Sequence, residues 1–144
     1  MRKPTIGLKL FDDRAPHTEP RSQSMDNIMD STPAPISDET FQAVRANAKP
    51  YTVVILKPGP NRHMDGAEAI IYSHGMRNVS LHLDGRLSVV CPSTDSTEFR
   101  GLGIFDATAE EVTILMDGDP AIQAGVLTYE VHPVRSFPGS TLPV

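Results

Sequence analysis

The order of periodic segments between Tyr51 and His132 constrains the fold of this chain more than any other feature. Residues 51–57 are apolar and β-branched, and the Pro58-Gly59-Pro60 run after them predicts the end of a strand. Residues 67–83 place apolar side chains three and four positions apart, and Asp84-Gly85 ends that pattern, which predicts a helix. A change from the strand repeat to the helix repeat within one segment indicates a domain that mixes strands and helices.

The elements that follow complete a split βαβ arrangement. Their order is strand, helix, strand, strand, helix, strand, which predicts an α+β fold of the ferredoxin-like βαββαβ type. In such a fold a four-stranded antiparallel sheet carries its helices on one face, and a second copy on the open face would make a homodimer. The remaining predicted elements are strands at residues 87–91 and 99–105, a helix from the Thr108 capping box to Met116, a turn at 121–125 and a strand at 127–132.

The first 49 residues differ in composition from the rest and are expected to form an arm. Residues 6–10 alternate apolar with small or charged side chains, which predicts a short strand. Ser37 is a suitable N-cap for a helix that Pro50 would end. The predicted organisation is an arm at residues 1–49 with a helix at 37–48, a domain at 50–135 and a tail at 136–144.

Charge and hydropathy exclude several classes of partner. The net charge is -5 and the basic residues are not clustered, so no nucleic-acid partner is expected. The longest apolar run, Val53–Leu56, is too short to cross a membrane, and the amino terminus lacks the apolar core of a secretion signal. A cytoplasmic location is therefore expected, and the single cysteine, Cys91, fits a reducing compartment.

Several of these residues together resemble the YCII family. His74, Asp84-Gly85-Arg86-Leu87 and Cys91-Pro92 are similar to that family's helix histidine, its Gly-x-Leu strand start and its Gly-Pro after the strand. The resemblance implies a dimeric α+β barrel with a shared His/Asp active-site pair, and some members of that family are lyases that remove a halide from an aromatic ring. The similarity continues through Gly103-Ile104-Phe105, Thr108–Glu111, Asp119-Pro120 and Ala124-Gly125-Val126, and covers Tyr51–Pro133.

By that resemblance, His74 and Asp119 are the candidate catalytic residues. A carboxylate that orients a histidine fixes its tautomer and stabilises the imidazolium formed when the ring takes a proton. His74 would then be the base and Asp119 its orienting partner. The alternative is that His74 packs between Ile70 and Asn78, while Asp119 caps the turn before Pro120.

The other candidate residues surround this pair. Arg77 follows His74 by three positions on the same side of the predicted helix and could hold a substrate carboxylate. Pro92 and Ser93 are candidate substrate contacts at the mouth of the pocket. Cys91, where the family more often has glycine, is expected to be a small buried hydrophobe and has no assigned catalytic role. Gly101 and Gly103 share one face of their strand, where another group should approach closely.

No metal site or cofactor is expected from the sequence. His63, His82 and His132 lack metal-ligand spacing, and the glycines match neither a Walker loop nor a dinucleotide fingerprint. The first functional hypothesis is a cofactor-independent lyase or isomerase acting on a small ring or acid. The alternative is a non-catalytic protein whose cavity binds a metabolite or whose arm docks on a partner.

Overall fold

The computed structural model describes residues 32–95 and 97–144. By its internal contacts the chain divides into two units, Met1–Ile36 and Ser37–Val144. The described part of the first unit, residues 32–36, holds no helix or strand. The strand predicted at residues 6–10 lies outside the described residues.

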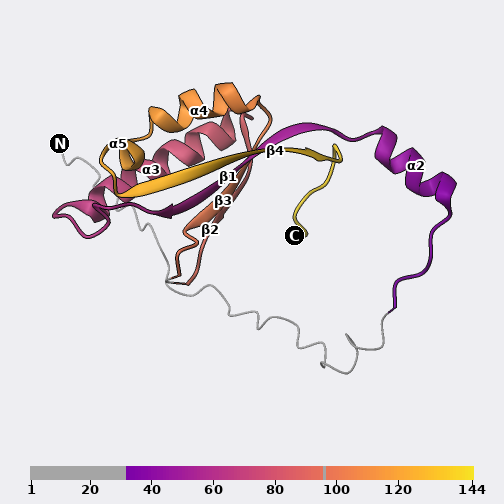
Figure 1. Cartoon of the computed structure of the whole chain (residues 1–144), viewed down its shortest axis with the longest axis horizontal. Coiled ribbons are helices and arrows are strands. Elements are labelled where there is room, and N and C mark those ends of the chain that lie inside the picture. The colour runs from indigo at the N-terminus through magenta and orange to yellow at the C-terminus, as the bar shows by residue number, and fades with distance from the viewer. Residues whose placement is uncertain (1–31, 96) are drawn as a thin grey trace, which may run out of the picture. The chain divides into compact units, whose positions relative to one another are not determined.

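The second unit contains a four-stranded antiparallel sheet with the strand order β2-β3-β1-β4 (Figure 1). This order places the first strand between the third and the fourth, with β2 and β3 forming a hairpin. It is the ferredoxin-like βαββαβ topology that the sequence predicts. The strands are β1 (Lys49–Pro58), β2 (Leu87–Pro92), β3 (Gly101–Phe105) and β4 (Leu127–Ser136).

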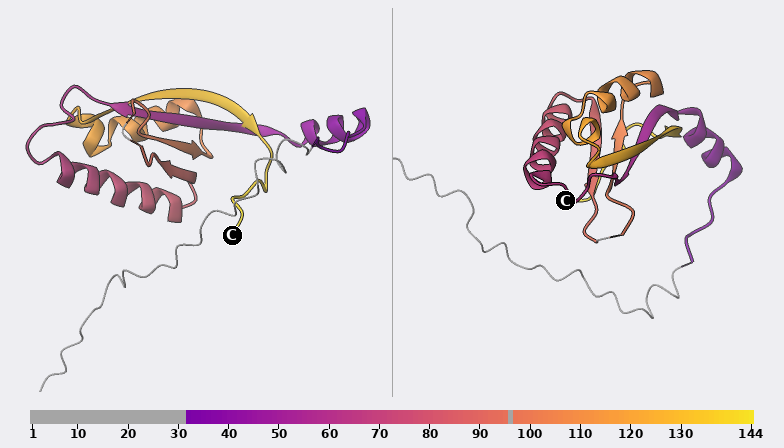
Figure 2. Two further views of the ribbon diagram at one scale, coloured as in Figure 1. Left: turned by 90° about the horizontal axis from the view of Figure 1, so that it is seen from below. Right: turned by 60° about the vertical axis from the view of Figure 1, so that its left-hand side comes forward.

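Three of the four described helices, α3, α4 and α5, cover the same face of this sheet (Figures 1 and 2). The remaining helix, α2, precedes β1 and contributes no buried residue. No helix in the described part of the chain has the length and apolar character needed to cross a membrane. The helices are α2 (Asp38–Ala46), α3 (Ala67–Leu83), α4 (Ala109–Asp117) and α5 (Pro120–Gln123).

Local signals set the helix ends. The Ser37 side chain accepts a hydrogen bond from the Thr40 amide, and Thr108 and Glu111 form a reciprocal capping box at the start of α4. Beyond α3, Gly85 adopts a positive φ of 80°, a backbone conformation that favours glycine. The predicted helix at residues 67–83 is confirmed at both ends.

The strand ends differ more from the prediction. The β1 strand begins at Lys49 and includes Pro50, and α2 ends at Ala46 rather than at residue 48. Pro50 fits because β1 pairs with β3 only over Thr52–Leu56, so at Pro50 only β4 is a neighbour. The β4 strand runs to Ser136 rather than ending at residue 132, since it pairs with β1 along all ten of its residues.

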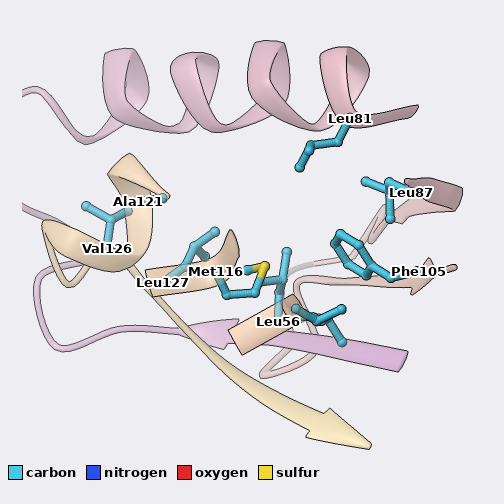
Figure 3. Close-up of a cluster of buried hydrophobic side chains, with 10 residues drawn as sticks. Leu56, Leu81, Leu87, Phe105, Met116, Ala121, Val126 and Leu127 are labelled. Carbon is cyan, nitrogen blue, oxygen red and sulfur yellow. The ribbon is translucent and has the colours of Figure 1, made fainter. Parts of the chain in front are cut away.

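The core lies between the sheet and the helices (Figure 3). Val54 and Leu56 of β1 are buried there, whereas Val53 and Ile55 point to the other face of the sheet. Helix α3 packs against α5 and β2, and Leu81 points from it toward the sheet. The buried core residues are Val54, Leu56, Leu81, Leu87, Phe105, Val112, Met116, Ala121, Val126 and Leu127.

Candidate active site

Helices α3 and α5 bring His74 and Asp119 together. His74 lies in the middle of α3, and Asp119 is the N-cap of α5, 45 positions later in the chain. The His74 Nδ1 atom is 2.9 Å from Asp119 Oδ2, and the two residues are 7% and 0% exposed. The pair that the sequence analysis singles out therefore forms a direct, buried contact.

The second carboxylate oxygen of Asp119 has a separate partner. Asp119 Oδ1 accepts a hydrogen bond of 2.9 Å from the Ala121 amide and so caps α5. Pro120 occupies the first turn of this helix, where its missing amide proton has no cost. The capping role and the contact with His74 are both present, because each uses a different oxygen.

The pKa of Asp119 lies below its ordinary value of 3.8. Burial alone would raise this pKa, because it disfavours the charged carboxylate. The hydrogen bond from His74, the charge of its ring when protonated, the Ala121 amide and the charge of Arg77 together outweigh burial. Asp119 is therefore an ionised acceptor at neutral pH.

An ionised Asp119 determines the tautomer of His74. A carboxylate can only accept, so His74 Nδ1 must carry the proton that it donates to Asp119. When the ring is neutral, the other nitrogen, Nε2, holds a lone pair and can accept from Asn78 Nδ2, which lies 2.9 Å away. The sequence analysis did not identify this role of Asn78, although its position four residues after His74 is the spacing of neighbours on one helix face.

A cavity of about 320 Å³ opens beside this pair, between α3 and the helix-covered face of the sheet. His74, Gly75 and Asn78 line it from α3. The rest of its wall is mainly apolar and comes largely from β1, β2 and β3. Its volume is at the low end of the roughly 300–1,000 Å³ of small-molecule sites, so it suits a small molecule better than a nucleotide.

Glycines form part of the cavity wall on β3. A Cβ atom at Gly101 would lie 3.0 Å from the Cys91 carbonyl oxygen, and one at Gly103 would lie 3.1 Å from Leu87 Cδ1. Both distances are tighter than ordinary van der Waals contact. The close approach that the sequence predicts at this strand is confirmed, and the approaching groups come from β2.

The other predicted site residues divide into two groups. Pro92 lines the cavity, whereas Arg77 and Ser93 are not part of its wall. Cys91, for which no site role was predicted, also lines the cavity and is half-buried rather than buried. Arg77 instead donates through Nη2 to the Leu115 carbonyl oxygen, and its Nη1 lies 3.5 Å from Asp119 Oδ2. Arg77 thus lies beside the Asp119 carboxylate, outside the cavity wall.

Of the other histidines in the described part of the chain, His63, His82 and His132, none lines the cavity or contacts the pair. His82 Nδ1 lies 2.8 Å from the Leu87 carbonyl oxygen, to which it can donate, and so links the end of α3 to β2, while His132 lies 3.5 Å from Glu130. Within residues 32–95 and 97–144 no three His, Cys, Asp or Glu side chains gather as a metal site would require.

Among the comparisons with known proteins, only those with solved structures give matches. No protein-family model and no curated protein matches the chain. Among solved structures, the chain is similar to 5-chloro-2-hydroxyhydroquinone dehydrochlorinase from Burkholderia phenoliruptrix in complex with 2,5-dihydroxybenzoquinone, with 18% identity and a TM-score of 0.42. The match covers 57% of this chain and 90% of that chain. At this similarity no functional conclusion is transferred, and YCII membership stays a prediction.

Proposed function

We propose that this protein is a small-molecule enzyme, a lyase or isomerase. In it, His74 moves a proton and Asp119 orients the His74 ring. The observation that carries the proposal is the contact between His74 Nδ1 and the fully buried Asp119 carboxylate, made at the wall of a cavity. A histidine held in this way presents Nε2 as the proton acceptor.

The proton would move as follows. Nε2 of His74 takes a proton from a carbon or oxygen of the substrate, and the imidazolium formed donates to Asp119 through Nδ1. The same nitrogen then returns the proton to another atom of the substrate or to the leaving group, so the ring ends in its starting state. Asn78 must release Nε2 or turn its amide so that Oδ1 faces the protonated nitrogen.

Loss of turnover in His74→Ala tests this proposal. A small-molecule library would be incubated with the wild-type protein and analysed for consumed compounds by mass spectrometry. We expect His74→Ala to abolish consumption while the thermal unfolding transition remains. His132→Ala is the matched control, because His132 is exposed and is not part of the cavity wall. Unchanged consumption in His74→Ala would contradict the proposal.

A second candidate is a metabolite-binding or accessory protein without turnover. The observation that favours it is that both ring nitrogens of His74 already have protein partners, Asp119 and Asn78. Asn78→Leu discriminates the two candidates. An enzyme whose Asn78 positions Nε2 should keep binding its substrate but turn it over more slowly, whereas a pure binding site should lose affinity alone.

Docking by the arm is tested by removing residues 1–46. The truncation should stop there because Lys49 begins β1 and pairs with Ser136 of β4. If the arm serves to dock a partner, the truncated protein loses that partner and keeps any turnover. An enzyme whose arm is dispensable keeps its activity in full.

A further inference from the structure

Gly75 is the central residue of α3, and nothing in the described protein requires a glycine there. It stands ninth among the 17 residues of Ala67–Leu83, and its backbone is helical. Apart from its chain neighbours and the backbone of its own helix, a Cβ atom at Gly75 would have no protein atom within 4 Å, so no close contact excludes a side chain. Glycine is among the least favourable residues in a helix interior, so its presence here lowers the stability of the helix although no contact in the described protein requires it.

The space that a side chain would fill borders the cavity. Gly75 lines the cavity at its exposed edge, and so do Ile71 and Val79, which are also exposed and lie one turn before and one turn after it on the same ridge of α3. His74 is its immediate neighbour in the chain. The helix packs against α5 and β2, and its middle forms part of the cavity wall. The missing side chain therefore leaves open space at the exposed edge of the cavity, next to the proposed base.

The chemistry of the wall restricts what can fill this space. Most of the wall is aliphatic or aromatic, so the body of a ligand must be apolar. Its one charged side chain is the exposed Arg100, and it contains no carboxylate, since Asp119 is not part of it. A guanidinium binds a carboxylate through two parallel hydrogen bonds, which favours an anionic ligand over a cationic one.

We propose that Gly75 determines specificity by admitting a small, mainly apolar carboxylic acid into the cavity beside His74, with its carboxylate toward Arg100. This inference rests on the proposed function, because it takes the cavity as the substrate site. It names Gly75 and Arg100 as binding residues and gives them no part in proton transfer. Neither was a candidate site residue in the sequence analysis, because a helix glycine and a loop arginine carry no local signal of a site.

Binding of simple acids and their neutral amides tests the proposal. Benzoate, cyclohexanecarboxylate and hexanoate, each beside its primary amide, would be titrated at millimolar concentration into the ¹⁵N-labelled full chain. We expect at least one acid to shift the amide signals of residues 74–79 and to bind more tightly than its amide. In Arg100→Gln that preference for the acid should disappear.

Gly75→Leu tests the open space itself. The variant should bind the acid about tenfold more weakly or worse, because the new side chain occupies ligand space. It should also unfold about 4 °C higher, because leucine is the better helix former. Ser80→Leu is the matched control, since Ser80 is exposed on the same helix and is not part of the cavity wall, and its affinity should equal that of wild type.

Three outcomes would overturn the inference: no acid binds the wild type, acids and amides bind equally, or Gly75→Leu binds as tightly as wild type. None of these depends on turnover. If acids bind as expected but His74→Ala consumes substrate like wild type, the ligand class stands and the proposed enzyme function fails. If turnover depends on His74 but no acid binds, the proposed enzyme function stands and the proposed ligand class fails.

Discussion

Each oxygen of the Asp119 carboxylate has its own partner, the His74 ring for one and the Ala121 amide for the other. The sequence offered these two roles as alternatives, because an aspartate before a proline is a common turn residue. That Asp119 holds both roles depends on where α3 lies relative to α5. Nothing in the local sequence around Asp119 contains this information.

Replacing Asp119 should separate the two roles by their effect on stability. Asp119→Ala leaves the Ala121 amide and the His74 ring without their partner in a buried place. We expect it to lower the free energy of unfolding by about 2–4 kcal/mol. Asp119→Asn keeps an oxygen that can cap α5, so it should lower the free energy of unfolding clearly less than Asp119→Ala does. Urea denaturation of both variants is the measurement, and equal losses would contradict the assignment of two roles.

The contribution of Asp119 to stability should depend on pH in the acid range. Its pKa in the folded protein lies below the ordinary 3.8, so the charged carboxylate stabilises the fold above that pH. As the pH falls below about 4, toward the lowered folded pKa, protonation removes this stabilisation. The stability gap between wild type and Asp119→Asn should therefore narrow as the pH falls below about 4. A gap that widens on acidification would contradict the direction of the shift.

Among the helices and strands, those whose ends are set by neighbouring residues in the chain are predicted correctly from the sequence. The helix at residues 67–83 and the capping box at Thr108 are correct because their signals lie within one or two turns. The strand at residues 51–57 was predicted, but its start at Lys49 was not, because Pro50 is a helix terminator in the sequence and becomes a strand residue only through pairing with β4. The full wall of the cavity under α3 was not predicted either, since its residues come from six separate segments.

The capping box should account for a measurable part of α4 stability. Thr108→Ala removes the acceptor for the Glu111 amide, and we expect a loss of about 1 kcal/mol in the free energy of unfolding. Thr108→Ser keeps the hydroxyl and serves as the control. Thermal unfolding followed by circular dichroism would distinguish them, and identical transitions for Thr108→Ala and wild type would count against the cap.

A proline in α2 should change the free energy of unfolding far less than a proline in α3. Ala43→Pro interrupts α2, which buries no residue, so the free energy of unfolding should change by less than about 1 kcal/mol. Ser80→Pro interrupts α3, which carries His74 and Leu81 in the core, and should cost about 3 kcal/mol or more. Denaturant titration checks both, and an equally large loss for Ala43→Pro would show that α2 is part of the cooperative unit.

At the scale of the whole molecule, the sheet face opposite the helices supports the expectation of a homodimer. Val53, Ile55, Leu102 and Ile104 lie on that face, and all four are half-buried in the single chain. We expect Ile55→Lys to convert a dimer into a monomer in light scattering, because it places a charge in the middle of the contact. Met76→Lys, at a side chain 59% exposed on α3, is the control and should stay dimeric. A monomeric wild type would contradict the expectation.

The central claim is that Asp119 fixes His74 with its proton on Nδ1 and its lone pair on Nε2. Two-bond ¹⁵N–¹H correlation spectra of the histidine rings report this tautomer directly at neutral pH. We predict the Nδ1-protonated form for His74 in the wild type. In Asp119→Asn an amide donor can face Nδ1, and the proton should move to Nε2. The same Nε2-protonated form in both proteins would contradict the claim, and with it the role of His74 as an oriented base.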